Sequence, residues 1–201
     1  METNIIFTLA IILMSVVIHE VSHGYAALML GDYTAKYEGR LTLNPLKHID
    51  PIGSVLVPII TSLAGFTFGW AKPVPYNPFN LRNQRWGEAM VAFAGPLSNI
   101  TIAVVFSIII RAGNGKLSYN FIVLSGVIVL INLVLAFFNL IPVPPLDGSK
   151  ILYAFLPQRM YHIRSSMERY GFFLVLAIVF LFWSMISPVI FYLFSLFTGL
   201  G

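Results

Sequence analysis

The chain has 201 residues, of which 58% are hydrophobic and only 10% charged, with a mean hydropathy of +0.84 and a net charge of +4. This composition excludes a soluble globule and is typical of a polytopic membrane protein whose outer surface faces the lipid bilayer. Cysteine is absent, which excludes disulfides, thiolate metal ligands and a cysteine nucleophile. No basic cluster with interleaved aromatic residues is present, so nucleic acid is not expected as a partner.

Five apolar runs of bilayer length, or close to it, follow one another along the chain. They cover residues 5–30, 52–70, 89–110, 121–141 and 172–197, and a shorter apolar piece covers 151–156. The first run lacks the basic flank of a signal peptide and is therefore predicted to be a retained span. We expect an all-α bundle of about four to six transmembrane helices, forming a single membrane-embedded domain over residues 1–201.

The first run contains the sequence His19-Glu20-Val21-Ser22-His23. Residues four apart lie on one face of a helix, so both imidazoles can reach the same metal ion, and zinc accepts such ligands. Glu20 occupies the position at which a metalloprotease keeps its general base. Ionisable side chains in a membrane helix are costly and functional by default. The motif predicts a catalytic zinc site that still lacks a third ligand.

The segment between the first two runs has two interpretations. Residues 31–51 include β-prone side chains such as Tyr33, Thr34 and Tyr37 and predict a short β-hairpin or sheet, with an ordinary polar loop as the alternative. The free edge of such a hairpin could pair with an extended peptide. His48 and Asp50 are interpreted as polar or capping residues of this segment rather than as metal ligands.

The run 52–70 is ambiguous, because it contains proline and glycine and leads into the proline-rich stretch 71–78. It either crosses the membrane or dips in and returns. The next run, 89–110, contains Gly95-Pro96-Leu97-Ser98-Asn99. Asn99 requires a polar partner inside the bundle, either to join packed helices or to support the metal site, and both interpretations remain open.

The third metal ligand is predicted to be Asp147. The apolar run from Phe121 ends at Asn139, and prolines at 142, 144 and 145 interrupt the helix before Asp147. Irregular backbone at membrane depth is tolerated where it is buried in protein or lines a wet cavity. Asp147 is the only acidic residue between Glu88 and Glu168, and a carboxylate is an accepted zinc ligand. The alternative is that Asp147 caps the helix that follows it.

The distribution of basic residues decides between the two topologies. If the run 52–70 re-enters, one side of the membrane holds Lys36, Arg40, Lys47, Lys72, Arg82, Arg85, Lys150, Arg159, Arg164 and Arg169. The other side holds only Arg111 and Lys116, so the first side is cytoplasmic. This topology brings Asp147 to the side of His23 and places the active site in the cytoplasmic half of the bilayer, with the predicted hairpin near the cytoplasmic face. A full crossing would separate Asp147 from His23, so we predict re-entry.

Taken together, the His19–His23 motif, the Gly95–Asn99 motif and the stretch from Asn139 to Asp147-Gly148 resemble the site-2 protease family of intramembrane metalloproteases. The segments 44–53 and 69–74 resemble its compact prokaryotic branch, which lacks PDZ and CBS domains. The resemblance implies one zinc ion per chain, held by His19, His23 and Asp147, with Glu20 as the general base. Asn139, together with Asn99, is the candidate for contacting the substrate or the oxyanion.

This resemblance implies a multi-pass protein of a prokaryotic cell membrane that hydrolyses peptide bonds in or near the transmembrane segment of a membrane-protein substrate. Two alternatives remain. A zinc protease of another family would use Glu88 as its third ligand, and a catalytically inactive metal-binding scaffold or transporter would not need Glu20. The sequence leaves open the substrate, the oligomeric state and the identity of the metal, since two histidines and a carboxylate also accept iron or cobalt.

Overall fold

The computed structural model describes residues 5–63, 69, 71–113, 116–157 and 160–200. Four helices in this part of the chain are long and apolar enough to cross a bilayer. They are α1 (Ile5–Met29), α4 (Gly87–Ala112), α5 (Tyr119–Asn139) and α7 (Tyr161–Thr198). The shortest, α5, has 21 residues and a length of about 32 Å at about 1.5 Å per residue, enough for the hydrocarbon core. The expectation of a helical, multi-pass membrane protein is confirmed.

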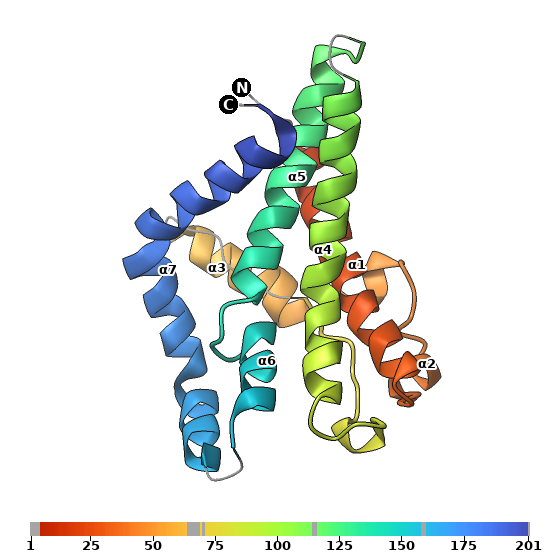
Figure 1. Ribbon diagram of the computed structural model, residues 1–201, viewed down its shortest axis with the longest axis vertical. Coiled ribbons are helices and arrows are strands. Elements are labelled where there is room, and N and C mark those ends of the chain that lie inside the picture. Colours follow the sequence, from red (N-terminus) through yellow and green to blue (C-terminus); the bar gives the residue numbers. More distant parts are fainter. Residues whose placement is uncertain (1–4, 64–68, 70, 114–115, 158–159, 201) are drawn as a thin grey trace.

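Short helices occupy the connections between these spans. They are α2 (Thr34–Tyr37), α3 (Val57–Leu63) and α6 (Asp147–Phe155), with single turns at Pro45–Lys47 and Pro78–Asn80 and a π-helix at Pro51–Leu56. In Figure 1, α4 and α5 run side by side, α6 continues below α5, and α7 stands apart at its lower end. Pro188 lies inside α7, which bends along its length (Figure 1).

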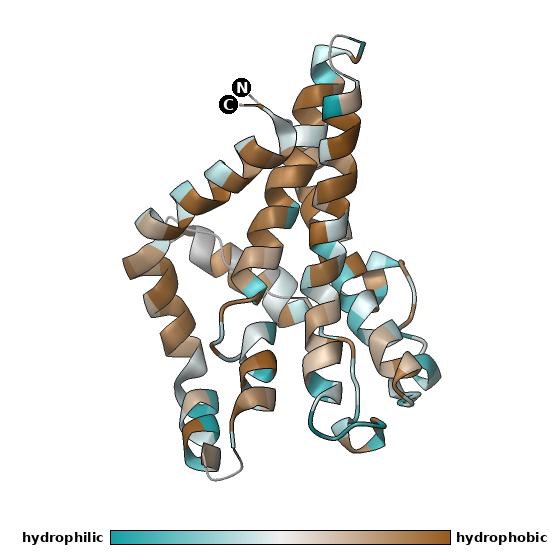
Figure 2. Cartoon of the chain, viewed as in Figure 1, coloured by the Kyte–Doolittle hydropathy of each residue, from teal (hydrophilic) through white to brown (hydrophobic). Residues whose placement is uncertain are grey.

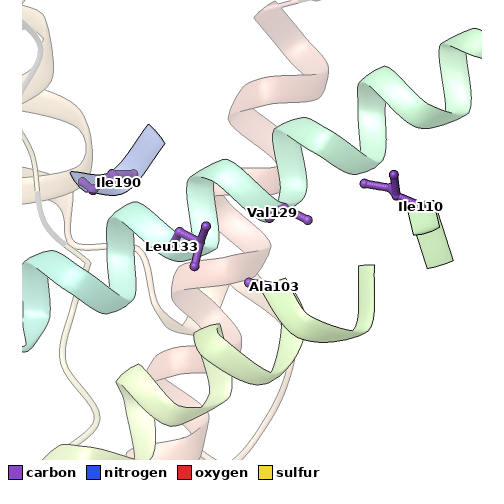
Figure 3. Packing of buried hydrophobic residues seen from close by; sticks show 5 residues of the cluster. All are labelled: Ala103, Ile110, Val129, Leu133 and Ile190. Atoms are coloured by element: carbon purple, nitrogen blue, oxygen red, sulfur yellow. The ribbon is translucent and has the colours of Figure 1, made fainter. Parts of the chain in front are cut away.

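The apolar core lies between α4, α5 and α7. Ala103 and Ile110 of α4 pack against Val129 and Leu133 of α5, and Ile190 of α7 closes the cluster (Figure 3). Many of the remaining large apolar side chains of the spans point outward, and Figure 2 shows the long helices apolar over most of their length. This outward apolar surface is the one that lipid would cover.

The β-hairpin predicted for residues 31–51 is wrong, since this fully described stretch contains α2 and a single 3₁₀ turn and no strand. Asp32 accepts hydrogen bonds from the backbone N–H and the hydroxyl of Thr34, which start the turn of α2. Gly39 then reverses the chain with a φ of 62°. Local bonds between side chains and backbone therefore satisfy groups that a ladder would otherwise pair. His48 and Asp50 serve the loop as expected: the His48 ring pairs with the Thr42 carbonyl, and Asp50 caps the π-helix.

Residues that flank the apolar run 52–70 on either side lie next to each other. The Lys72 N–H donates to the His48 carbonyl at 2.8 Å, which joins the residues on either side of the run. Arg40 strengthens this junction by donating to the carbonyls of Lys72 and Pro73. Residues 64–68, where a re-entrant run would turn back, lie outside the described residues.

The proline-rich stretch after α5 is non-helical, as predicted, and allows α6 to start beside α1. A side chain at Gly148 would collide with the carbonyl oxygens of Leu140 and Ile141, so the chain can fold this tightly only with glycine after Asp147. Leu146 is the N-cap residue of α6, and Asp147 is the first residue of the helix. The Asp147 carboxylate is not a cap; it points instead toward α1.

Candidate metal centre and active site

Side chains from α1 and α6, two helices far apart in the sequence, meet in one place. Asp147 Oδ2 lies 3.0 Å from His19 Nε2 and 3.3 Å from His23 Nε2, although the sequence separates these residues by more than 120 positions. Both histidines are buried, with 5% and 8% of their surface exposed. Glu20 offers a carboxylate oxygen to the same group, within 4.8 Å of the two imidazoles.

The other nitrogen of each imidazole is also engaged. His23 Nδ1 lies 2.7 Å from the backbone carbonyl oxygen of Val91, and His19 Nδ1 lies 2.6 Å from Asn99 Oδ1. A carbonyl oxygen can only accept, so each neutral ring carries its proton on Nδ1 and directs the lone pair of Nε2 toward Asp147. With both rings neutral, the two Nε2 atoms face the Asp147 oxygen at 3.0 and 3.3 Å as acceptors, an arrangement that a cation between them would stabilise.

The donor set fits zinc in both chemistry and spacing. Zinc binds imidazole nitrogen and carboxylate oxygen at about 2.0–2.1 Å, and a tetrahedral site keeps its ligand atoms about 3.3 Å apart. Gly95 of α4 packs closely against the two imidazole rings and forms one wall of the site. A Cβ atom at Gly95 would come within 2.5 Å of Nε2 of both His19 and His23, so only glycine leaves these ligand atoms in place.

Glu20 is held in place by the backbone of residues 71–77, a segment that is neither helix nor strand. The Val74 N–H donates to Glu20 Oε2 at 2.8 Å. Prolines precede and follow Val74, so this N–H is the one backbone donor of residues 73–75. One carboxylate oxygen is therefore anchored, and the second oxygen remains for chemistry.

A cavity of about 150 Å³ contains these groups. Its lining comprises His19, Glu20, His23, Pro73, Val74, Tyr76, Val91, Ala92, Asn139, Pro145, Asp147 and Lys150. Five of the six residues predicted from the sequence therefore line one cavity, including Asn139, whose side chain also donates to the Leu135 carbonyl. Asn99 is fully buried behind His19 and lines no part of it. Glu88, the alternative third ligand, lines a separate cavity of about 550 Å³ and pairs with Arg164 at 3.7 Å.

Two residues of the site were missed by reasoning from the sequence. Asn132 of α5 donates and accepts hydrogen bonds in the group behind His19, and its only signal is that it is a polar residue inside an apolar span. Lys150 follows Asp147 by one helical turn, and its ammonium lies 4.9 Å from the centre of the Tyr76 ring. Lys150 lines the metal cavity and also the neighbouring cavities of about 550 and 480 Å³. It therefore stands where the three cavities meet.

The chain resembles known proteins over most of its length. The model of peptidase family M50 matches residues 108–182. The chain is 36% identical to "Putative zinc metalloprotease YwhC" of Bacillus subtilis over 189 residues, which cover 88% of this chain and 84% of that protein. It is 31% identical to "Putative zinc metalloprotease Rip2" of Mycolicibacterium smegmatis, over 83% of this chain and 64% of that protein. "Zinc metalloprotease MJ0392" of Methanocaldococcus jannaschii is 29% identical over 100% of this chain and 50% of its own length. No solved structure matches the chain significantly.

Proposed function

Because the chain belongs to peptidase family M50 and is an intramembrane zinc metalloprotease, we propose that α1 and α6 supply both its metal ligands and its general base. The ligands are His19, His23 and Asp147, and the base is Glu20. The observation that carries this assignment is the convergence of two imidazole lone pairs on one carboxylate oxygen at 3.0 and 3.3 Å. The Gly95 wall supports it, because it holds the space around these atoms free of side chains.

The reaction is hydrolysis of a peptide bond. Zinc, when bound, acts as a Lewis acid that polarises a carbonyl and lowers the pKa of water toward about 7. Glu20 accepts the proton of the attacking water and delivers it to the leaving amine. The Val74 N–H fixes Oε2 of Glu20 and so aims the other oxygen into the cavity. Asn139 remains the candidate for contacting the substrate or the oxyanion, since its amide has a second N–H beyond the one that Leu135 accepts.

The active site lies in the cytoplasmic half of the cell membrane in this proposal. The hydrogen bond from Lys72 to His48 supports re-entry of the run 52–70, because two residues joined at 2.8 Å cannot stand on opposite faces of a core about 30 Å thick. With re-entry, ten of the twelve basic residues share the cytoplasmic side. His19 then lies about 16 Å along the helix from the cytoplasmic end of the first apolar run, at about 1.5 Å per residue.

The substrate is a membrane protein cleaved in or near its transmembrane segment. A substrate helix hides its carbonyls in hydrogen bonds, so it must unwind before Glu20 can act on it. The segment 71–77 borders the metal cavity through Pro73, Val74 and Tyr76, so an unwound peptide that enters the cavity would lie against it. No β-hairpin is needed for this role.

Three substitutions test the assignment. Glu20→Gln should retain zinc and lose cleavage of a membrane-protein substrate, because the amide cannot accept the proton of water. Asp147→Ala should lose zinc as well as cleavage. Glu88→Ala is the matched control, since it removes a carboxylate from a neighbouring cavity without touching the metal cavity. Zinc retained in Asp147→Ala and lost in Glu88→Ala would overturn the assignment.

A further inference from the structure

We propose that Asn132 is a positioning residue. It sets the orientation of the Asn99 amide, and through that amide it determines which ring nitrogen of His19 carries the proton. The inference rests on the proposed role of His19 as a metal ligand. Asn132 lies on α5 and lines no part of the metal cavity. Both asparagines are completely buried, at 0% exposure, so each of their polar atoms needs a partner within the protein.

The direction of this hydrogen-bond chain follows from its far end. Asn132 Nδ2 lies 2.9 Å from the backbone carbonyl of Ile128, which can only accept, so the NH₂ group of Asn132 must face it. The same NH₂ group donates to the Ser15 hydroxyl at 3.0 Å. The Oδ1 atom of Asn132 is then left to face Asn99, and it must accept.

Asn99 inherits its orientation from this oxygen. Its Nδ2 donates to Asn132 Oδ1 at 2.8 Å, so its own Oδ1 is turned to His19 Nδ1 at 2.6 Å. The His19 proton therefore stays on Nδ1, and Nε2 keeps its lone pair for the metal. The remaining partner of Asn99 Nδ2 is the Ser15 carbonyl at 3.4 Å, a longer and weaker contact. Asn132 is thus the main group that distinguishes the two orientations of the Asn99 amide.

Without Asn132, rotation of the Asn99 amide by 180° would cost little. The rotated amide presents its NH₂ group to His19 Nδ1, which must then accept and carry the ring proton on Nε2 instead. That proton points at Asp147 and occupies the space of the cation. Partners that orient a metal-ligating histidine in this way typically change metal affinity by about 10- to 100-fold.

The test is the zinc dissociation constant of the detergent-solubilised protein, measured by competition with a chelator, alongside the melting temperature of the metal-free protein. Asn132→Leu should weaken zinc binding by about 10- to 100-fold. Asn132→Asp should keep more of the affinity than Asn132→Leu, because it retains an oxygen that faces Asn99 Nδ2 although it loses the donor to the Ile128 carbonyl. Ser107→Ala is the control: the Ser107 hydroxyl is buried in α4 and has no hydrogen-bond partner among the described residues.

A double substitution separates positioning from general support of the fold. In Asn99→Asp both side-chain atoms facing His19 and Asn132 are oxygens, so no orientation can place a donor on His19. Adding Asn132→Leu to Asn99→Asp should therefore leave zinc affinity unchanged, whereas Asn132→Leu alone weakens it.

Two results would overturn the proposal: wild-type zinc affinity in Asn132→Leu, or an equal loss from Asn132→Leu in both backgrounds. A lower melting temperature of the metal-free protein with unchanged affinity would reduce Asn132 to a structural residue and reject the proposal as well. Failure of the proposed function is distinguishable, because it would appear as zinc retained in His19→Ala whatever occupies position 132.

Discussion

Gly95→Ala adds a single methyl group at the wall of the metal centre. The new Cβ would lie 2.5 Å from Nε2 of both His19 and His23, whereas ordinary contacts of this kind begin at 3.4 Å. The deficit is 3.4 − 2.5 = 0.9 Å, and it must be met by moving α4 or the two ligand atoms. Metal–ligand distances tolerate a change of only about 0.2 Å. The site therefore cannot absorb the methyl group and keep its geometry.

The expected result of Gly95→Ala is a loss of zinc binding far greater than the loss of fold. Forcing a methyl group into a packed interior typically costs about 1–3 kcal/mol, offset by about 1 kcal/mol from replacing glycine inside a helix. The free energy of unfolding of the metal-free protein should therefore fall by no more than about 2 kcal/mol. Zinc content after purification, cleavage of a membrane-protein substrate and metal-free melting temperature are the three measurements.

The matched control for Gly95→Ala is Gly126→Ala. Gly126 lies in α5, and a Cβ there would meet ring atoms of Phe194 at 3.6 Å and a methyl group of Leu200 at 3.9 Å, both ordinary contacts. This variant should keep zinc and melt at the wild-type temperature or slightly above it, since alanine favours the helix. Wild-type zinc affinity in Gly95→Ala would refute the reasoning, because the two imidazoles would then not stand where the structure has them.

Three further outcomes are expected. Lys150→Met should reduce cleavage by about 100-fold with zinc content unchanged, because Lys150 lines the cavity in which negative charge develops on the scissile carbonyl. Lys150→Arg keeps the positive charge and should retain more activity. Equal turnover in the two variants would contradict this role. Burial acts to raise the pKa of Asp32, but hydrogen bonds from Thr34, Asn80 and Asn77 outweigh it and lower the pKa below its ordinary value. A carboxyl group with a depressed pKa stabilises the fold at pH values above its unfolded-state pKa of about 3.9, and this stabilisation is lost as the pH falls. Asp32→Asn should therefore lower the melting temperature at pH 7. It should also make the melting temperature fall less steeply between about pH 5 and pH 2 than it does in the wild type. Asn77→Cys, the single cysteine of such a variant, should resist a membrane-impermeant thiol reagent added outside intact cells and react after lysis; ready labelling from outside would reject the cytoplasmic placement.

The spans and the meeting of His19, His23 and Asp147 could be predicted from the sequence because their signals are local or unusually sparse. A run such as 121–141 needs no knowledge of its neighbours to be recognised as membrane-spanning. His19 and His23 share a helix face by their spacing alone. Asp147 could be paired with them across more than a hundred residues, because so few carboxylates in the chain were available and topology required the partners to share one side.

The hairpin prediction failed for the opposite reason. Tyr33, Thr34 and Tyr37 have high β-propensity, but this preference mainly reflects packing on a sheet that residues 31–51 do not form. Asp32 binds Thr34 and also the backbone N–H of Asn77, so its carboxylate ties α2 to the segment 71–77. Such a contact depends on where a distant segment lies, and no propensity scale contains that information.

The residues that support the metal centre could not be assigned from the sequence for the same reason, although each of them is a polar residue in an apolar span. A polar group inside a membrane span must find a partner there, so each buried asparagine or serine marks a contact whose identity only the fold reveals. Ser15, Asn99 and Asn132 lie on three different helices, and their side chains complete one another's hydrogen bonds next to His19. The apolar background that makes these residues easy to notice also favours their pairing with one another, since all three are buried and hydrogen bonds are stronger in a low-dielectric interior. In this chain, polar residues of the spans therefore form a continuous hydrogen-bonded chain from a backbone carbonyl of α5 to Nδ1 of His19, and Nε2 of the same ring faces Asp147.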